Sequence, residues 1–372
     1  MTKVKVIANY LPQYHTIPEN DKWWGKGFTD WVAVKNSKPL FKGHKQPRVP
    51  LHHHYYSLND VNEIRWQAEL ARKYGIYGFG IYHYWFSSEM QLLQKPAELI
   101  RDNKDIDIHY MFIWDNCSWK RTWSKEKFSN DWAPKFDGEQ EVEHSASGIL
   151  AELVYGTEPD WKKHFDYLLT FFKDDRYIKI DNKPVFAVFQ PHNNFPVIKK
   201  MVVYWDELAK KSGFNGIICM TKDNCKGANL DYRLRYTPLS PEYFWDAVKI
   251  KIKNVIYARL NKIRFYDYDS NWQNIIKNAK KANSKTYLSG FVNFDDSPRR
   301  LNKARIIKSG SPQKFGKYME QLMRISLRQH KEYVFVTAWN EWGEGAYLEP
   351  DEENKYAYLE ELKQAIDKVN RE

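Results

Sequence analysis

The chain has 372 residues, of which 42% are hydrophobic and 16% aromatic, and its formal net charge is +11. This hydrophobic content is enough to bury a large core, so the composition excludes a chain that is disordered over long stretches. No stretch approaches the roughly 20 consecutive apolar residues of a membrane-spanning helix, and we expect none. The length fits two domains of roughly 150 residues each or one α/β barrel of about 250 residues or more.

The N-terminus and the cysteines indicate the compartment. Residues 1–7 read as a strand that begins at once, without the charged, apolar and small-residue regions of a signal peptide. The cysteines Cys117, Cys219 and Cys225 are sparse and odd in number, which argues against a disulfide framework and a zinc site. We therefore expect a cytoplasmic protein without a metal or cofactor. A secreted form whose signal was removed is the alternative.

The positive charge favours anionic partners, but it is spread along the chain. The densest run of Lys and Arg lies at residues 246–264, among Ile, Val and Leu. It fits a solvated helix face, which we favour, or a basic segment lying on anionic lipid at the inner membrane face. No recognised motif accompanies the charge, so we expect no nucleic-acid partner.

Eight apolar segments rich in β-branched and aromatic residues predict strands. They are residues 4–10, 77–84, 108–114, 184–189, 216–221, 233–238, 287–294 and 333–339. Most are continuously apolar, as expected of parallel strands buried on both faces. Helical patterns fill several gaps: from an N-cap at Ser57 to Gly75, over 196–211, over 312–329 after Ser311, and over 356–369.

This alternation predicts an α/β fold, a single (β/α)8 TIM barrel over residues 1–372 with elaborated loops at its C-terminal face. The polar residues at about 124–147 read as a surface insertion after the third strand. A doubly wound open sheet is the alternative. The GxGxxG and GxxxxGK[ST] nucleotide fingerprints of that fold are absent from the sequence.

Residues 337–350 carry the strongest functional signal. A buried strand runs directly into two tryptophans, an asparagine and two acids, Glu341 and Glu344, and glycines then free the backbone to turn. Carboxylates at the C-terminal end of a barrel strand point to where the loops converge. A close pair of carboxylates supplies the acid and the base that glycosidic cleavage needs. The alternative is that both are ordinary loop acids.

Aromatic, amide and acidic side chains at the other strand ends predict a carbohydrate-binding lining. The predicted substrate-binding residues are Tyr14, His15, Trp24, His83, Tyr84, Trp85, Trp114, Asp115, Asn116, Gln190, Asn293, Trp339, Asn340 and Trp342. Aromatic rings stack on the apolar face of a sugar, and amides and carboxylates bind its hydroxyls. The tryptophan-rich residues 23–31 fit a sugar-stacking loop or a plug of the barrel equally well. For the histidines at 52–54 we favour a solvated loop over a metal site.

Six segments together resemble a known family. They are residues 10–15, 20–31, 43–48, 82–86, 176–178 together with 183–184, and 338–350. These segments follow one another in order over nearly the whole chain. The sequence resembles the WbsX-type proteins, which are glycoside hydrolase family 99-like and occur in bacterial surface-polysaccharide biosynthesis loci. The resemblance implies a (β/α)8 barrel.

The resemblance also implies roles for the two acids. Glu341 would deprotonate the sugar's own 2-hydroxyl, which attacks the anomeric carbon to give a 1,2-anhydro sugar. Glu344 would protonate the leaving oxygen and later activate water. The configuration is then retained without a covalent enzyme intermediate, unlike the usual retaining pair.

The chain departs from its relatives at two positions. Endo-α-mannosidases of family 99 read Glu-Trp-His-Glu-Gly where this chain has Gly343 in place of His. Many WbsX-type proteins read Trp-Ala-Asn-Glu-Asn-Trp at the third strand, where this chain has Cys117 in place of Glu. Asp115 is one substitute carboxylate.

The leading hypothesis is a retaining, endo-α-mannosidase-like hydrolase of an α-linked bacterial surface glycan or its lipid-linked precursor. A glycosyltransferase of O-antigen or capsule biosynthesis is the first alternative, and the D-x-D patterns at 105–107 and 267–269 fit it. A non-catalytic glycan-binding protein is the second. In every case the expected partner is a carbohydrate.

Overall fold

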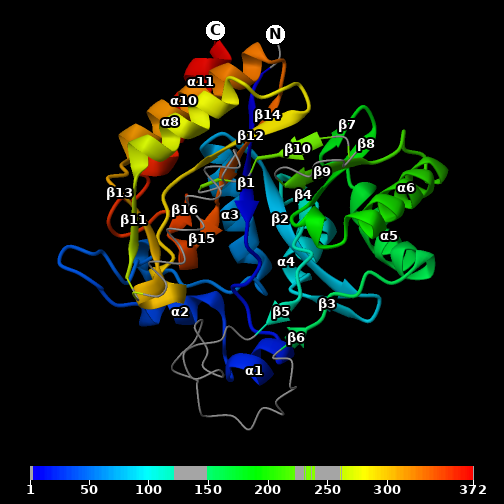
Figure 1. The fold of residues 1–372 in the computed structure, drawn as a ribbon, viewed down its shortest axis with the longest axis horizontal. Coiled ribbons are helices and arrows are strands. Elements are labelled where there is room, and N and C mark those ends of the chain that lie inside the picture. Colours follow the sequence, from blue (N-terminus) through cyan, green and yellow to red (C-terminus); the bar gives the residue numbers. More distant parts are fainter. Residues whose placement is uncertain are drawn as a thin grey trace.

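The structure, a computed structural model, describes residues 3–120, 149–222 and 262–371, with residues 230, 232–235, 237, 238 and 260 between the last two ranges. Eight parallel strands form a closed barrel (Figure 1). They are β1 (Lys5–Tyr10), β2 (Ile76–Ser87), β4 (His109–Trp114), β8 (Lys183–Val188), β9 (Ile218–Lys222), β10 (Tyr232–Leu234), β12 (Thr286–Phe291) and β14 (Tyr333–Thr337). Each strand pairs with the next one in the chain, and β14 pairs with β1 to close the ring. The predicted (β/α)8 barrel is therefore confirmed, and the open sheet is excluded.

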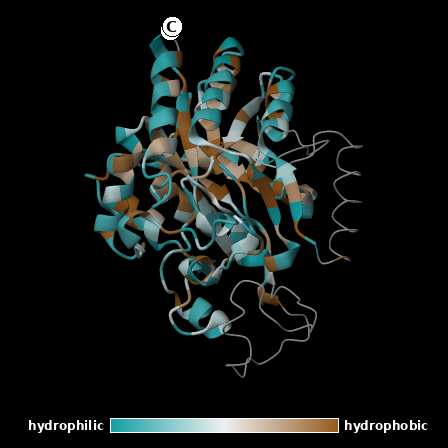
Figure 2. Ribbon diagram, turned by 90° about the vertical axis from the view of Figure 1, so that its left-hand side faces the viewer, coloured by the Kyte–Doolittle hydropathy of each residue, from teal (hydrophilic) through white to brown (hydrophobic). Residues whose placement is uncertain are grey.

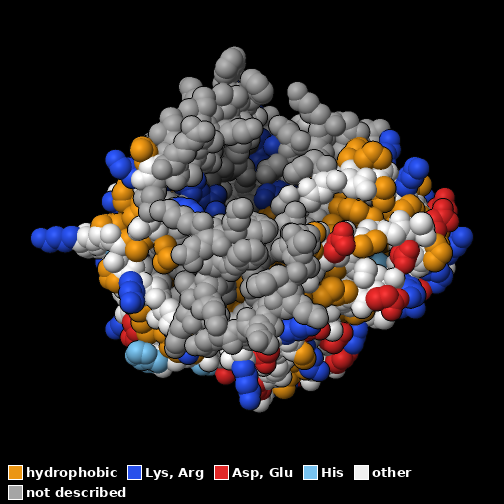
Figure 3. Space-filling model, turned by 60° about the horizontal axis from the view of Figure 1, so that its bottom comes forward, with side chains coloured by type: hydrophobic (Ala, Val, Ile, Leu, Met, Phe, Trp, Pro, Cys, Tyr) orange, Lys and Arg blue, Asp and Glu red, His pale blue; other side chains and the backbone are white. Residues whose placement is uncertain are grey.

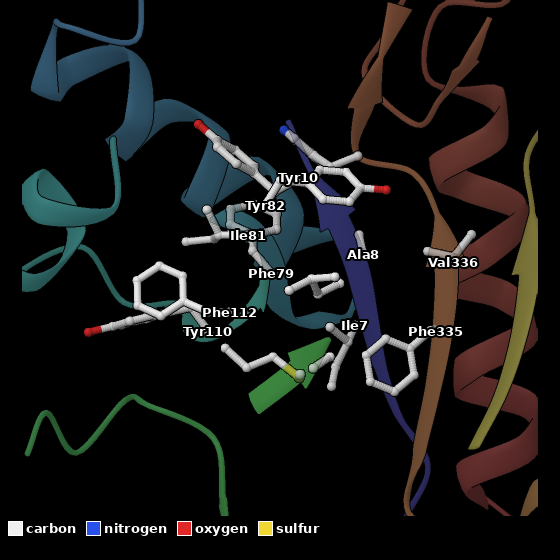
Figure 4. Packing of buried hydrophobic residues seen from close by; sticks show 14 of the residues in the cluster. Ile7, Ala8, Tyr10, Phe79, Ile81, Tyr82, Tyr110, Phe112, Phe335 and Val336 are labelled. Carbon is white, nitrogen blue, oxygen red and sulfur yellow. The ribbon is translucent and has the colours of Figure 1, made fainter. Parts of the chain in front are cut away.

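The barrel interior explains why the strands are apolar throughout. Ile7 lies opposite Phe335 of β14 on one side and Gly78 of β2 on the other. The buried side chains of β1, β2, β4 and β14 pack together in Figure 4, where the rings of Tyr10 and Phe79 are 4.9 Å apart. Burial of this apolar area is the main driving force for the fold.

Helices cover the outside of the barrel, and Figure 2 shows hydrophobic strands inside helices with hydrophilic outer faces. They are α3 (Val61–Lys73), α4 (Lys95–Asp102), α5 (Glu158–Phe172), α6 (Phe195–Lys211), α8 (Tyr268–Ala279), α10 (Pro312–Arg328) and α11 (Ala357–Arg371). The helices α10 and α11 approach closely at Gly316, where a Cβ would lie 2.7 Å from Glu361 Oε2. Glycine is needed there for the two helices to pack.

One predicted helix start is wrong. Ser57 was the expected N-cap, but α3 begins at Val61, and the side chain of Asp60 accepts a 2.8 Å hydrogen bond from the backbone N–H of Asn62. The backbone N–H of Asp60 donates to the carbonyl of Ser57, so Ser57 opens a turn before the helix. At α10 the expected cap is present, because Ser311 accepts from the backbone N–H of Lys314.

Short elements gather where the barrel strands end, several of them in the lower part of Figure 1. They are α1 (Pro18–Trp24), α2 (Asp30–Asn36), η1 (Leu51–His53), β3 (Met90–Leu92), β5 (Trp119–Lys120), β6 (Ile149–Ala151), η3 (Pro191–Asn193), α9 (Ser297–Arg300), η4 (Leu301–Lys303), β15 (Asn340–Glu341), η5 (Trp342–Glu344) and β16 (Ala346–Tyr347). Outside the barrel, β11 (Arg264–Asp267) pairs with β13 (Arg305–Lys308), and β7 (Lys179–Ile180) pairs with the barrel strand β8.

Several predictions fall outside the described residues. The proposed insertion at residues 124–147 and nearly all of the basic run at 246–264 lie there. That the whole chain is one domain stays a prediction. Within the described ranges, no helix combines the length and apolarity that crossing a membrane requires.

Candidate active site

A cavity of about 420 Å³ opens at the C-terminal face of the barrel. Its wall is formed by Leu11, Gln13, Asn20, Trp24, Phe28, Tyr82, Tyr84, Asp115, Ser118, Trp119, Phe189, Arg299, Glu341 and Glu344. Figure 3 views the molecule from this end and shows a hollow in which Lys and Arg side chains are visible. The wall combines aromatic rings with amides and acids, which is the composition expected for binding a sugar.

Glu341 and Glu344 lie on this wall. Glu341 ends β15 and Glu344 ends η5, so one tight loop after the last barrel strand presents both carboxylates. The Glu341 side chain is 7% exposed and that of Glu344 25% exposed. Burial raises the pKa of Glu341 to about 8, the Arg299 cation opposes this rise, and the charge of Glu344 adds to it. The two acids therefore differ in depth within one site.

Arg299, which no pattern in the sequence indicated as a site residue, contacts both acids. Its Nη2 is 3.3 Å from Glu341 Oε2, and its Nη1 is 3.2 Å from Glu344 Oε1. The same Nη2 is 3.0 Å from Oδ2 of the buried Asp30. Arg299 lies on α9, beyond the seventh predicted strand, and its partners are far away in the sequence. Arginine is suited to such a site because its planar fork stays charged when buried.

The first barrel strand anchors the loop that carries the acids. The side chain of Asn340 accepts a 2.7 Å hydrogen bond from the backbone N–H of Leu11 and donates to the Leu11 carbonyl at 3.0 Å. The hydroxyl of Tyr14 donates to the Asn340 carbonyl at 2.5 Å and accepts from the backbone N–H of Trp342. These bonds hold the backbone on both sides of Glu341.

A second anchor holds Glu344. The backbone N–H of Asp295 donates to the Glu344 carbonyl at 2.6 Å. The Asp295 carboxylate is itself bound by His44 Nε2 at 2.8 Å, by Gln46 Nε2 at 3.0 Å and by Arg48 Nη2 at 3.6 Å. The segment at 43–48, noted in the sequence without a role, therefore braces the loop that carries Glu344.

Five of the predicted site residues line the cavity: Trp24, Tyr84, Asp115, Glu341 and Glu344. The hydroxyl of Tyr84 accepts a 2.9 Å hydrogen bond from Gln13 Nε2. Burial raises the pKa of Asp115, and a hydrogen bond with the Cys117 thiol opposes this rise. Asp115 is thus the carboxyl that the third strand presents to the cavity.

His83, Trp85 and Trp114 do not line the cavity, and they contact helix α5. His83 Nε2 is 2.8 Å from His164 Nε2, and the ring of Trp85 stacks on that of His164 at 4.3 Å. The indole of Trp114 donates to the Trp85 carbonyl. Successive side chains of a strand point to opposite faces, so the neighbours of Tyr84 on β2 point away from the cavity.

The remaining predicted residues also lie off the described wall: Tyr14, His15, Asn116, Gln190, Asn293, Trp339, Asn340 and Trp342. Asn116 and Gln190 bond to each other, with Asn116 Nδ2 donating to the Gln190 carbonyl at 2.8 Å. Asn293 accepts from the backbone N–H of Phe294. His15 and Trp339 are buried. Substrate binding by these eight residues stays a prediction.

The sequence left two interpretations open for the tryptophan-rich residues 23–31 and two for the histidines at 52–54. Trp24 lines the cavity, whereas Trp31 is buried against the rings of Tyr14 and Trp342. The tryptophan-rich segment therefore supplies both wall and packing. His52 and His53 are exposed, as expected of a solvated loop.

Sequence and structure comparisons place the chain among known proteins. The family model described as "Glycosyltransferase WbsX" matches residues 6–362. The chain belongs to the WbsX family. Among curated relatives, "Uncharacterized protein WxcX" from two strains of Xanthomonas campestris pv. campestris is 28% identical over 97% of this chain. The match covers 49% of that protein, so the chain spans about half the length of these relatives.

Solved structures share the fold of this WbsX-family chain. The GH99 endo-alpha-mannosidase from Bacteroides thetaiotaomicron is 13% identical, with a TM-score of 0.56 over 100% of this chain and 99% of that chain. A protein described as glycoside hydrolase-like, also 13% identical, has a TM-score of 0.54 over 98% of this chain and 94% of that one. At this identity the likeness shows the (β/α)8 fold alone. The family description is that of a carbohydrate-active enzyme.

Proposed function

We propose that the protein is a retaining glycoside hydrolase that cleaves an α-linked glycan through a 1,2-anhydro sugar. The observation that carries the proposal is the placement of Glu341 and Glu344 on the wall of one cavity, at the end of the last barrel strand. The endo-alpha-mannosidase named above, which has the same fold, supports the choice of an α-linked substrate.

The two acids have distinct tasks in this reaction. Glu341 takes the proton of the sugar's 2-hydroxyl, the 2-oxygen bonds to C1, and the bond from C1 to the leaving oxygen breaks as Glu344 donates its proton. Glu344 then takes a proton from water, whose oxygen bonds to C1 while the bond between C1 and the 2-oxygen breaks. The 2-oxygen recovers its proton from Glu341. Oε2 of Glu341 is buried with Arg299 Nη2 as its ion-pair partner at 3.3 Å, and a carboxylate oxygen can accept a further hydrogen bond, here from a sugar hydroxyl.

The rest of the wall suits a sugar ring. Tyr82, Tyr84, Trp24, Trp119 and Phe189 offer aromatic faces for its C–H groups. Gln13, Asn20 and Asp115 offer polar groups for its hydroxyls. A bacterial surface glycan or its lipid-linked precursor is the proposed substrate, and an enzyme in the cytoplasm would meet such a precursor at the inner membrane face.

The family description keeps a glycosyltransferase as the second candidate. In that case an acceptor hydroxyl would replace water in the second step. The D-x-D patterns do not favour a transferase that uses them, because their acids already have structural partners. Asp105 pairs with Arg65, and Asp267 caps α8. Asp269 pairs with Lys314.

The test is to incubate the enzyme with a panel of α-linked oligosaccharides and to follow the first-formed product by NMR. We expect α-configured hemiacetal product, and its absence when Glu341 and Glu344 are both replaced by Gln. Glu353→Gln, at a surface residue that pairs with Lys45, is the matched control. An initial β product would contradict retention, and transfer to an added sugar without hydrolysis would establish the transferase.

A further inference from the structure

The buried guanidinium of Arg299 forms ion pairs with three acids at the site. Asp30 is on α2, Glu341 on β15 and Glu344 on η5, and all three have oxygens within 3.3 Å of the guanidinium of Arg299. The Arg299 side chain is 8% exposed. The mechanism proposed above uses two of these acids and gives no task to Arg299 or to Asp30.

The nitrogens of Arg299 are divided between the acids. Nη1 contacts Glu344, while Nη2 contacts Glu341 and is braced from the other side by both Asp30 oxygens, at 3.0 and 3.1 Å. The two terminal nitrogens of a guanidinium are held at a fixed separation in one plane. A braced guanidinium therefore sets the distance and direction between the carboxylates of Glu341 and Glu344.

Gly343, between the two acids, leaves the room for this cation. A Cβ at Gly343 would lie 2.5 Å from Arg299 Nε and 2.8 Å from Asp30 Oδ2. These distances are well below normal contact, so even alanine would displace the guanidinium or the loop. The glycine noted in the sequence as a departure from the family 99 motif is thus the residue that the arginine requires.

We propose that Arg299 is the positioning residue of the acid pair: its guanidinium, braced by Asp30 and admitted by Gly343, fixes the separation of Glu341 and Glu344 and favours negative charge on them. The inference rests on the proposed function only in treating this pair as the catalytic one.

The charged and titratable groups that face Glu341 determine how the loss of Arg299 would change the ionisation of Glu341. They are Arg299, Asp30, Glu344 and the hydroxyls of Tyr14 and Tyr84, whose own pKa values burial raises well above normal. Arg299 is the cation among them. Without it, Glu341 would face two carboxylates and two neutral phenols, and its ionised form would become less stable.

The experiment titrates the carboxyl groups directly. Protein labelled with ¹³C at the Glu side-chain carboxyl is followed by NMR as a function of pH, and Glu341→Gln assigns the Glu341 signal. We expect Arg299→Met to raise the titration midpoint of Glu341 by about one to three pH units. Arg299→Lys should raise it less, because it keeps the charge and loses the fork. Arg324→Met, at an arginine that pairs with Glu320 on α10, is the control and should leave it unchanged.

Gly343→Ala provides an independent variant that keeps every charge. We expect it to raise the same midpoint and, in a crystal structure, to change the distance between the carboxylates of Glu341 and Glu344. If Arg299→Met does not fold, Arg299→Lys and Gly343→Ala decide the question. An unchanged midpoint in the folded variants would overturn the proposal. The NMR titration does not measure turnover. Its result therefore tests the role of Arg299 even if the protein is not a hydrolase.

Discussion

The indole Nε1 of Trp342 donates a 2.6 Å hydrogen bond to Oε2 of Glu349, behind the loop that presents Glu341 and Glu344. Glu349 also accepts from the Tyr56 hydroxyl at 2.9 Å and from Gln67 Nε2 at 2.7 Å. This third acid of the segment at 337–350 is buried, and its contacts fix the tryptophan that lies between the two cavity acids. Its place in the fold is that of a support for the loop.

Glu349→Gln should destabilise the protein. Both carboxylate oxygens of Glu349 accept hydrogen bonds. In the Gln variant, the side-chain NH2 group would replace one of these oxygens and would face a hydrogen-bond donor. Burial raises the pKa of Glu349 to about 7, so the comparison belongs at about pH 8, where the carboxyl is ionised. We expect a loss of about 1–3 kcal/mol in the free energy of unfolding, measured with a chemical denaturant. Equal stability of the variant and of wild type would show that these bonds contribute nothing.

The pH dependence of hydrolysis should identify the role of Glu341. A base must be ionised, and the ionised fraction of a carboxyl grows as the pH rises through its pKa. With the pKa of Glu341 raised to about 8, kcat/KM for a substrate whose leaving group needs no proton from Glu344 should increase with pH up to about that value. Should kcat/KM fall over this range instead, Glu341 acts as the protonated acid, and the two roles are exchanged.

Substrates without a 2-hydroxyl should be inert. The anhydro route makes the 2-oxygen the nucleophile, so a 2-deoxy or 2-fluoro analogue offers Glu341 no proton to remove. Binding of the analogue, measured by calorimetry, should persist, because the aromatic wall formed by Tyr84 and Trp119 is unchanged. Normal turnover would point to direct attack by a carboxylate.

The barrel could be predicted from the sequence because its strands are buried on both faces. Continuous apolar segments mark such strands, and all eight appear within a few residues of their predicted bounds. The same property hides which way each side chain points. Tyr82 and Tyr84 face the cavity, while His83 faces α5. Both faces of β2 are apolar or aromatic, so the sequence does not indicate which alternate side chains point into the cavity.

The acids of the site could be predicted, but their cation could not. Glu341 and Glu344 follow directly after a recognisable strand. Arg299 lies on a short helix in a loop and meets Asp30 across 269 positions of sequence. Such a contact depends on how two loops fold over the end of the barrel, for which the sequence carries no periodic signal.

The most direct test of the account measures how each acid variant responds to the leaving group. We expect Glu344→Gln to lose about 100- to 10,000-fold in kcat on the natural type of linkage. Activity should return at the bond-breaking step with a substrate whose leaving group needs no proton, such as a dinitrophenyl glycoside. Glu341→Gln should be inactive on both, because the 2-hydroxyl still lacks its base. Rescue of Glu341→Gln by the activated substrate, or full activity of Glu344→Gln on the natural linkage, would contradict the assignment of the pair.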